Sequence, residues 1–475
     1  MNVTNMKGGK QKIFDPSKTC PQKDRTASEG YVEGQAFMWI TENNLTTNDY
    51  RLGNGLLEHI LSPTNLNAAF KQVKRNKGAG GVDKMEVESL KGYLVTNKDM
   101  LIKSIQMGKY RPNPVRRVCI PKENGKQRQL GIPTVLDRVI QQSIAQKLTS
   151  NYEPQFSANS YGFRPKRSAH QALRKCQDYI TQGYIYAVDI DLERFFDTVN
   201  HSKLIEVLSR TIKDGRVVSL IHKYLNAGVM QEDHYEETYE GVPQGGPLSP
   251  LLGNILLNEL DRELEKRGHK FVRYADDMVI LCKSRRSAER TMESIVSYIE
   301  RTLFLKVNRD KSKVATVKDI KFLGYTFYQL EGKGRLRIHP KSMTKMKTRI
   351  KQLTSRSNGW GNERRKEALS QYIKGWVQYF KLADMRKLLE KTDEWYRRRL
   401  RMVIWKQWKL IKTRVANLIK LGINKYKAYE WANTRKGYWH IANSFILSRT
   451  ITNVRLRIAG YVFLLDYYES VRVVY

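Results

Sequence analysis

The sequence has few cysteines and no long apolar run. Its four cysteines, Cys20, Cys119, Cys176 and Cys282, are scattered over 475 residues without a CxxC pair, which disfavours a disulfide framework and a structural zinc site. No apolar stretch approaches the roughly 18 residues that a membrane-spanning helix needs, and the polar N-terminus lacks the apolar core of a signal peptide. We therefore expect reduced thiols, a cytoplasmic location and no membrane partner.

Acidic residues are also scarce relative to basic ones. Asp and Glu total 47 against 85 Lys and Arg, a formal net charge of +38 that is spread along the chain. Such a chain binds a long polyanion, because each phosphate that it neutralises releases condensed counterions. Neither a GxGxxG nor a GxxxxGK[ST] loop is present, which disfavours dinucleotide-binding and P-loop chemistry. Nucleic acid is the expected partner.

The pattern of apolar residues predicts an α+β fold followed by helices. Residues 1–52 are polar and are expected to form a loosely ordered extension. The predicted strands are 115–122, 186–191, 271–274 and 278–281. A helix is predicted at 136–148, and further helices fill the gaps. This alternation indicates a palm-like layout rather than a doubly wound sheet. Beyond about residue 342 we expect long basic helices rich in Trp and Tyr.

Two adjacent carboxylates stand at the tip of a predicted hairpin. Asp276 and Asp277 follow Tyr274 and Ala275 between two apolar strands. Neighbouring like charges raise each other's pKa, so such a pair favours a bound cation. Consecutive side chains of a strand point to opposite faces, and only a turn lets them converge. By itself, a pair of this kind is more often an ordinary exposed turn.

A third carboxylate makes the pair more informative. Asp191 ends another apolar strand and lies 276 − 191 = 85 residues before Asp276, so only the fold could bring them together. Three carboxylates at neighbouring strand ends can hold two Mg²⁺ ions about 3.5–4 Å apart. Gln244, in a segment rich in Gly and Pro at 241–250, offers a donor and an acceptor to a nucleotide. The alternative for that segment is a plain loop.

In this order along the chain, the motifs resemble the reverse transcriptase/maturase that bacterial group II introns encode, in particular the compact group IIC type. The resemblance covers nearly everything after residue 55. Besides the segments already described, the matching ones are 76–83, 110–134, 160–165, 321–325, 375–380, 397–401 and 432–437. The resemblance implies a right-hand polymerase with fingers and palm at 53–335. An all-α thumb (maturase domain X) at 336–410 and a small helical DNA-binding domain at 411–475 would follow.

The resemblance also implies which residues surround the reacting groups. Asp191, Asp276 and Asp277 would be catalytic. Together with Leu192 they would bind two Mg²⁺ ions, for which Mn²⁺ can substitute. Asp189 precedes Asp191 by two residues and would share a strand face with it, but the family pattern favours Asp191.

Contacts to the incoming nucleotide are expected from cations and one aromatic ring. Lys122 and Arg128, with Arg116 as a weaker third, match positions that hold the triphosphate. Gln244 completes the nucleotide-binding set. Phe196 matches a bulky gate that rejects a ribose 2′-hydroxyl, since a ring can exclude an added hydroxyl by its volume.

Lys311 matches a position that suits a proton donor to pyrophosphate. A solvated charge on a helix is an equally good interpretation of this lysine.

The region from Trp395 to Lys412 interleaves aromatic rings with cations. Arg and Lys can follow phosphates while rings stack on unpaired bases. For Trp395, Trp405 and Trp408, a place in the core is the better interpretation, whereas the basic face is better explained by nucleic acid. The expected nucleic-acid-binding residues are Arg397, Arg398, Arg399, Arg401, Lys406, Lys409, Lys412, Arg435 and Lys436.

The activity implied by the resemblance is RNA-directed DNA synthesis. The protein would also bind its intron RNA as a maturase, aid splicing and support retrohoming by target-primed reverse transcription. Its partners would be group II intron RNA, an RNA template/DNA primer duplex, dNTPs and target DNA, at the bacterial nucleoid. No Cys- and His-containing endonuclease domain is expected, because the last cysteine is Cys282. The alternatives are a non-enzymatic RNA-binding splicing factor and another class of reverse transcriptase, such as that of a retron.

Overall fold

The computed structural model describes residues 55–121, 125, 127–232 and 234–472. The expected extension at 1–52 and the nucleotide-binding candidate Lys122 lie outside them. The chain divides into two compact units. Of the described residues, the larger unit holds 55–349 and 382–388, and the smaller unit holds 350–381 and 389–472. The finer domain boundaries at 335 and 410 stay predictions.

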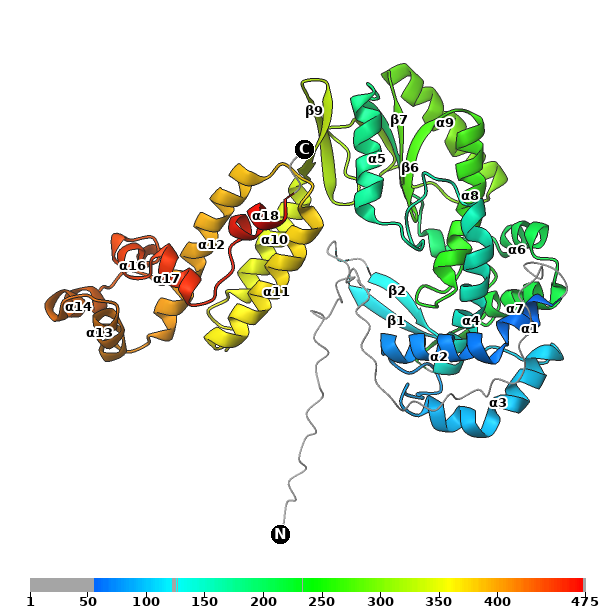
Figure 1. Ribbon diagram of the computed structural model, residues 1–475, viewed down its shortest axis with the longest axis horizontal. Coiled ribbons are helices and arrows are strands. Elements are labelled where there is room, and N and C mark those ends of the chain that lie inside the picture. The colour runs from blue at the N-terminus through cyan, green and yellow to red at the C-terminus, as the bar shows by residue number, and fades with distance from the viewer. Residues whose placement is uncertain (1–54, 122–124, 126, 233, 473–475) are drawn as a thin grey trace, which may run out of the picture. The chain divides into compact units, whose positions relative to one another are not determined.

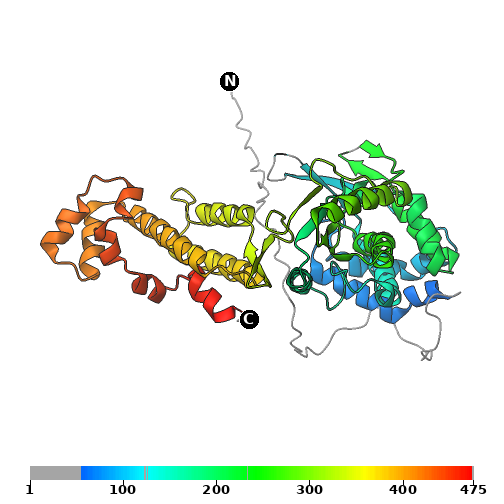
Figure 2. The ribbon, with the colours of Figure 1, turned by 90° about the horizontal axis from the view of Figure 1, so that it is seen from above.

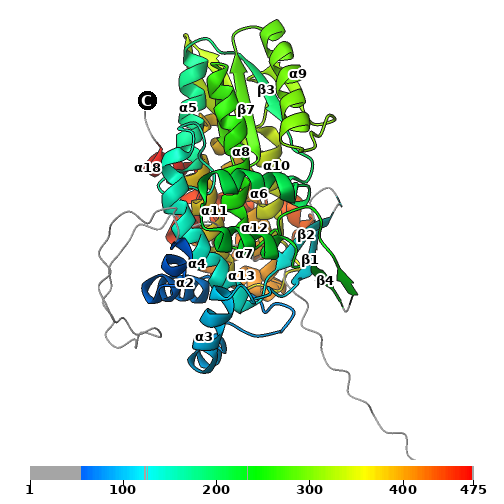
Figure 3. The same cartoon turned by 90° about the vertical axis from the view of Figure 1, so that its right-hand side faces the viewer.

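The larger unit contains a four-stranded antiparallel sheet, here called the central sheet, and Figure 1 labels two of its strands, β6 and β7, between α5 and α9. Its strands, in spatial order, are β6 (Lys270–Tyr274), β7 (Asp277–Cys282), β3 (Tyr186–Ile190) and β8 (Lys313–Thr316). The first three were predictable from their apolar runs, and these predictions are confirmed. The helices packed on this sheet are α5 (Ala169–Thr181) and α8 (Ser249–Lys266) against β6, and α9 (Arg285–Thr302) against β3 and β8 (Figure 3).

A second sheet of the larger unit contains the predicted strand at 115–122. Its strands, in spatial order, are β2 (Gln127–Ile132), β1 (Val115–Pro121), β4 (Val229–Gln231) and β5 (His234–Glu236). The pairing of β1 with β2 is antiparallel and that of β1 with β4 is parallel. The remaining helices before residue 230 are α1 (Leu56–Ile60), α2 (Pro63–Asn76), α3 (Leu90–Gln106), α4 (Val135–Tyr152), α6 (His201–Thr211) and α7 (Gly215–Leu225), with the short 3₁₀ helices η1 (Glu153–Gln155) and η2 (Phe195–Asp197). Helix α4 contains the predicted helix 136–148.

A two-stranded hairpin of β9 (Tyr325–Leu330) and β10 (Lys333–Ile338) follows the central sheet along the chain. Helix α10 (Pro340–Leu353) begins directly after it. Within the part of the chain that the structure describes, no strand follows Ile338, which confirms that the C-terminal part is helical. The sequence reasoning missed β4, β5, β8, β9 and β10, because these strands are short or carry exposed polar residues that hide the alternation.

The smaller unit is all helical, and α11 and α12 are its long helices (Figure 2). Its helices are α11 (Asn362–Phe380), α12 (Arg386–Gln407), α13 (Ile411–Lys420), α14 (Lys425–Ala432), α15 (Tyr438–Ile441), α16 (Phe445–Thr450), α17 (Asn453–Ile458) and α18 (Leu464–Val471). Helix α18 packs on α11, and α13 packs on α14. None of the helices that the structure describes is long and apolar enough to cross a bilayer.

Asp393 of α12 fixes the start of α18. Its carboxylate accepts hydrogen bonds from the amides of Leu464 at 3.0 Å and Leu465 at 2.9 Å, two of the donors that a helix N-terminus leaves without partners. Burial raises the pKa of Asp393 to about 6. We predict that Asp393→Ala lowers the free energy of unfolding by about 1–3 kcal/mol, because these amides lose their acceptor. Urea denaturation measures this change.

The matched control for Asp393 is Asp466→Ala on α18 itself. Asp466 pairs with Arg457, and both side chains are nearly half exposed, so this pair contributes at most about 1 kcal/mol. Amide exchange across 464–471 should accelerate in the Asp393 variant and much less in the control. Equal effects of the two substitutions would contradict the anchoring role of Asp393.

Candidate active site

The register of the central sheet brings the predicted carboxylates together. Ile190, the last residue of β3, pairs with Met278 of β7. Asp191 follows the first of these residues and Asp277 precedes the second, so the antiparallel register places them side by side at one end of the sheet. The fold thus brings together Asp191 and Asp277, which are far apart in the sequence, as a shared metal site requires.

Asp276 lies in the turn that joins β6 to β7. Tyr274 pairs with Asp277 across the hairpin, which leaves Ala275 and Asp276 as a two-residue loop. The side chain of Asp276 is exposed, whereas that of Asp277 is half-buried at the start of β7.

One cavity of the larger unit collects these carboxylates and faces them with cations. Its acidic lining comprises Asp189, Asp191, Asp276, Asp277 and Asp319, and Leu192 lies beside them. Its basic lining comprises Lys311, Lys313, Lys321, Lys341 and His339. Oxygen ligands of this kind suit divalent cations, and the lysines supply the charge that phosphate groups require.

The carboxylates are crowded enough to disfavour full ionisation in the absence of a cation. Burial, together with the charges of Asp189, Asp276 and Asp191, raises the pKa of Asp277 to about 7. Burial also raises the pKa of Asp189 to about 6, against the opposing effect of Lys313. Raised carboxylate pKa values of this kind are typical of sites where a bound cation would relieve the repulsion between the carboxylates.

The donor set fits magnesium in its chemistry. Mg²⁺ is bound in proteins mainly by carboxylate oxygens. Three of the aspartates that line the cavity, Asp191, Asp276 and Asp277, are the ones predicted to bind it. Among the described residues, however, no three Asp, Glu, His or Cys side chains converge closely enough to form a preformed metal cluster. The carboxylate of Asp191 is instead paired with the ammonium group of Lys311 at 3.0 Å.

Lys311 lies in a turn and not on a helix. Helix α9 ends at Thr302, and the structure places Lys311 in the turn before β8. The alternative interpretation, a solvated charge on a helix, is therefore wrong about the helix. The lysine side chain lines the carboxylate cavity and is 63% exposed. A primary ammonium group in this position can donate a proton to a group bound in the cavity.

Two of the expected nucleotide contacts, Phe196 and Gln244, line a second, smaller cavity together with Asp197. The guanidinium of Arg128 donates to Gln244 Oε1 at 3.0 Å, and the amide nitrogen of Gln244 donates to Asp197 at 3.0 Å. Phe196 packs edge to face on Phe195, with ring centroids 5.0 Å apart. Arg128, Gln244 and Phe196 are thus brought together.

Arg116 lies in a different setting. Its guanidinium donates twice to the carbonyl of Gly80, at 3.1 and 2.8 Å, so it is tied to the glycine-rich loop at 76–81. Asp197 was not singled out from the sequence, although its place directly after Phe196 was the available signal.

The predicted nucleic-acid-binding residues of the smaller unit fall into two groups. Lys409, Lys412, Arg435 and Lys436 are exposed, whereas the five from α12 are half-buried. Three of these five donate hydrogen bonds to backbone carbonyl groups. Arg398 donates to Trp439, Arg399 to Lys351 and Thr354, and Arg401 to Ile451. The other two lie near rings, Arg397 near Phe463 and Lys406 near Tyr438. The exposed group is therefore the freer to meet phosphate.

The tryptophans of this region are partly core residues. Trp405 is 1% exposed, which confirms the core interpretation for it, while Trp395 and Trp408 are half-buried. The rings of Trp405 and Trp408 contact each other, with centroids 5.7 Å apart.

Two family models match separate parts of the chain. The model of reverse transcriptase (RNA-dependent DNA polymerase) matches residues 120–327, and that of the group II intron maturase-specific domain matches residues 343–422. The first match contains the three carboxylates, and the second contains most of α10 and all of α11 and α12.

Several relatives share substantial identity with the chain. Protein YkfC of Escherichia coli (strain K12) is 33% identical over an alignment of 326 residues, which covers 60% of this chain and 85% of YkfC. The group II intron-encoded protein LtrA of Lactococcus lactis subsp. cremoris is 36% identical over 225 residues, 47% of this chain and 37% of LtrA. Among solved structures, a chain of a partial Cas6-RT-Cas1–Cas2 complex is 26% identical with a TM-score of 0.34, over 52% of this chain and 42% of that one.

Proposed function

This chain belongs to the family of group II intron-encoded reverse transcriptases and maturases, and we propose that it extends DNA primers on RNA templates at the cavity beside Asp191, Asp276 and Asp277. The observation that carries this assignment is the register of β3 and β7, which sets Asp191 beside Asp277 although 86 residues (277 − 191) separate them in sequence.

The proposed division of labour follows from the two cavities. When bound at the carboxylates, two Mg²⁺ ions would activate the primer 3′-hydroxyl and stabilise the pyrophosphate leaving group. Arg128 offers a cation to the triphosphate, and Gln244 orients that guanidinium through its carbonyl oxygen. Phe196 lines the pocket into which the sugar would fit and excludes a 2′-hydroxyl by its volume.

Lys311 is proposed to protonate the leaving pyrophosphate. We predict that Lys311→Ala lowers kcat by about 100-fold, within the range of general acid catalysis, with little change in template–primer affinity. If the only role of Lys311 were to pair with Asp191, the loss of kcat would be small. The two side chains are 63% and 39% exposed, and exposed pairs contribute at most about 1 kcal/mol.

Lys311→Arg is the matched variant. Arginine keeps the positive charge beside Asp191 but is a poor proton donor, because its guanidinium holds its proton far more tightly than a lysine ammonium group does. Single-turnover incorporation rates should be low in both variants. Recovery of the wild-type rate by arginine would show that charge alone matters and would contradict the donor role.

The helical region is proposed to act as thumb and DNA-binding domain. Residues 336–410 would grip the A-form duplex by its shape and backbone. Residues 411–475 would contact target DNA through the exposed Lys412, Arg435 and Lys436, next to the exposed Lys409 at the end of the thumb. Binding of intron RNA, help in splicing and retrohoming by target-primed reverse transcription complete this proposal. Since the proposed partners are RNA and chromosomal DNA, we expect the protein to act in the cytoplasm at the nucleoid.

Extension of a DNA primer annealed to an RNA template, in Mg²⁺ and with all four dNTPs, tests the proposed activity directly. We expect extended DNA products and, in a parallel binding assay, retention of group II intron RNA. Tight binding of intron RNA without any extension would favour the non-enzymatic splicing factor. Extension without intron RNA binding would favour another class of reverse transcriptase.

A further inference from the structure

The segment at 160–165 contacts the turn that carries Asp276. The amide of Tyr161 donates to the carbonyl of Arg273 at 2.9 Å, and the amide of Arg273 donates to the carbonyl of Asn159 at 2.9 Å. This backbone pairing is parallel and sits at the end of β6. The segment is therefore attached to the strand that leads into the turn.

Gly162 brings this segment into direct contact with the turn itself. A Cβ atom at Gly162 would lie 2.3 Å from the backbone nitrogen of Ala275 and 2.8 Å from the carbonyl carbon of Tyr274. Both atoms belong to the main chain and cannot move aside as a flexible side chain would. Only glycine permits this approach.

The turn needs support because its backbone is strained. Ala275 has a φ of 59°, in the left-handed region that residues other than glycine, Asn and Asp rarely adopt. Strained conformations persist only where the surroundings determine them. The neighbours of Ala275 must supply that constraint.

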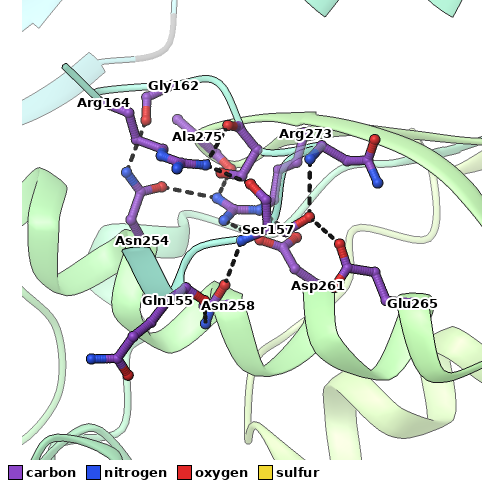
Figure 4. Close-up of polar contacts among 12 residues, drawn as sticks. Gln155, Ser157, Gly162, Arg164, Asn254, Asn258, Asp261, Glu265, Arg273 and Ala275 are labelled. Carbon is purple, nitrogen blue, oxygen red and sulfur yellow. Dashed lines mark hydrogen bonds and ion pairs between the residues drawn. The ribbon is translucent and has the colours of Figure 1, made fainter. Parts of the chain in front are cut away.

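Arg273 supplies part of it from within the core. Its side chain is 1% exposed and donates to the carbonyl of Ala275 at 2.9 Å and to Oδ1 of Asn254 at 2.9 Å. The other two nitrogens of its guanidinium group donate to the two carboxylate oxygens of Asp261, which is 0% exposed. The amide group of Asn254 donates in turn to the carbonyl of Gly162 at 2.8 Å. Figure 4 shows this closed network.

The partners of this network share one face of α8. Asn254, Asn258, Asp261 and Glu265 follow each other at spacings of four, three and four residues, so they form a polar stripe along the helix (Figure 4). Asn258 accepts from the amide of Ser157, and Glu265 accepts from the hydroxyl of the same serine. Asn254, Asn258 and Asp261 are buried, whereas Glu265 is exposed. Buried polar groups fix one arrangement when all of them are satisfied.

We propose that Arg273, Asn254 and Gly162 position the turn that carries Asp276 and Asp277 for metal binding. Arg273 holds the carbonyl group of Ala275 from the core, and Gly162 lies against the backbone of Tyr274 and Ala275 and limits the movement of the turn. These residues do not touch substrate; they act through the backbone of the turn. The proposal rests on the proposed polymerase function, because it assigns a consequence for catalysis to a structural contact.

Gly162→Ala tests the proposal, with Gly215→Ala as the matched control. The added methyl group of Gly162→Ala must displace the turn, whereas a Cβ at Gly215 meets no atom within 4 Å. We expect kcat of primer extension to fall by about 10- to 100-fold in Gly162→Ala, the usual range when a partner that orients a ligand is disturbed. The KM for dNTP and the affinity for template–primer should stay within about threefold, and the control should match the wild type.

Two further readouts separate positioning from a loss of fold. Mn²⁺ binding, followed by electron paramagnetic resonance on a complex with dideoxy-terminated primer, should weaken about tenfold in Gly162→Ala. Amide hydrogen exchange should accelerate at 274–277 and not across the remaining sheet. A uniform increase in exchange, with a lowered Tm and lost template–primer binding, would show a merely structural role and overturn the proposal.

The double variant Arg273→Met/Asp261→Val approaches the same contact without leaving an uncompensated buried charge. Replacing both partners of a buried ion pair by apolar residues is often neutral for stability, so the double variant should fold. We expect the same loss of kcat and of Mn²⁺ affinity as in Gly162→Ala. Wild-type values for both quantities in the folded double variant would overturn the role of Arg273. If the wild type itself extends no primer, the polymerase proposal fails, and the exchange comparison still decides whether Gly162 and Arg273 hold the turn.

Discussion

Asp276→Ala is expected to abolish primer extension while leaving the fold intact. Divalent ions bound at these carboxylates would supply several kcal/mol of transition-state stabilisation, and each 1.4 kcal/mol corresponds to a tenfold change in rate. We therefore expect the single-turnover rate of incorporation to fall on the order of 1,000-fold or more. Asp276 is exposed in its turn, so its removal should change the free energy of unfolding by no more than about 0.5 kcal/mol.

Asp310→Ala is the matched control for Asp276. Asp310 is another exposed turn aspartate of the larger unit and does not line the carboxylate cavity. Its variant should extend primers at the wild-type rate, and both variants should bind template–primer with wild-type affinity. Undiminished synthesis by Asp276→Ala would remove this residue from the catalytic set, and an equal loss in both variants would point to a general effect of charge.

Three of the four strands of the central sheet were predictable because they are mostly apolar. Residues 186–191 and the two halves of the hairpin at 271–281 have the continuous apolar character of buried strands, and β3, β6 and β7 form there. In contrast, β8 consists of Lys313, Val314, Ala315 and Thr316, of which none is fully buried. A prediction based on apolar runs cannot detect such an edge strand, since its pairing depends on a partner that is distant in sequence.

The carboxylates of the site were predictable for an electrostatic reason, and the residues that hold them were not. Adjacent aspartates at a turn indicate a cation through the repulsion of their charges alone. Asn254 and Asp261 lie on α8, where periodicity analysis assigns polar residues to the solvent face. The structure buries both of them, at 2% and 0% exposure, because Arg273 of β6 supplies their partner.

The basic residues of α12 show the same limit. The sequence shows five cations within ten residues, a pattern typical of a nucleic-acid surface. It does not show that Arg398, Arg399 and Arg401 bond to carbonyl groups of the smaller unit. An arginine can satisfy a backbone acceptor as well as a phosphate, and only the fold decides between the two.

Phe196→Ala is expected to relax the choice of sugar more than it reduces synthesis. The ring lines the small cavity beside Gln244, and its removal opens the space that a 2′-hydroxyl would need. The backbone of the pocket should persist, because the carbonyl of Phe196 still accepts a hydrogen bond from the amide of Val242. Exclusion by a packed side chain corresponds to about 1–3 kcal/mol, so the ratio of kcat/KM for dNTP to that for rNTP should fall by roughly 10- to 100-fold.

We expect sugar discrimination to depend on the volume of the side chain at 196 and not on its aromatic character. Phe196→Leu keeps much of that volume and should therefore retain most of the discrimination, whereas Phe196→Ala should lose it. Single-nucleotide incorporation, measured with dNTP and rNTP of the same base, separates the two variants. Since Phe195 packs edge to face on this ring, the alanine variant also loses a buried contact, and its thermal unfolding should be followed in parallel. An unchanged dNTP to rNTP ratio in a folded Phe196→Ala variant would refute the steric gate, because no other property of the ring opposes a hydroxyl group.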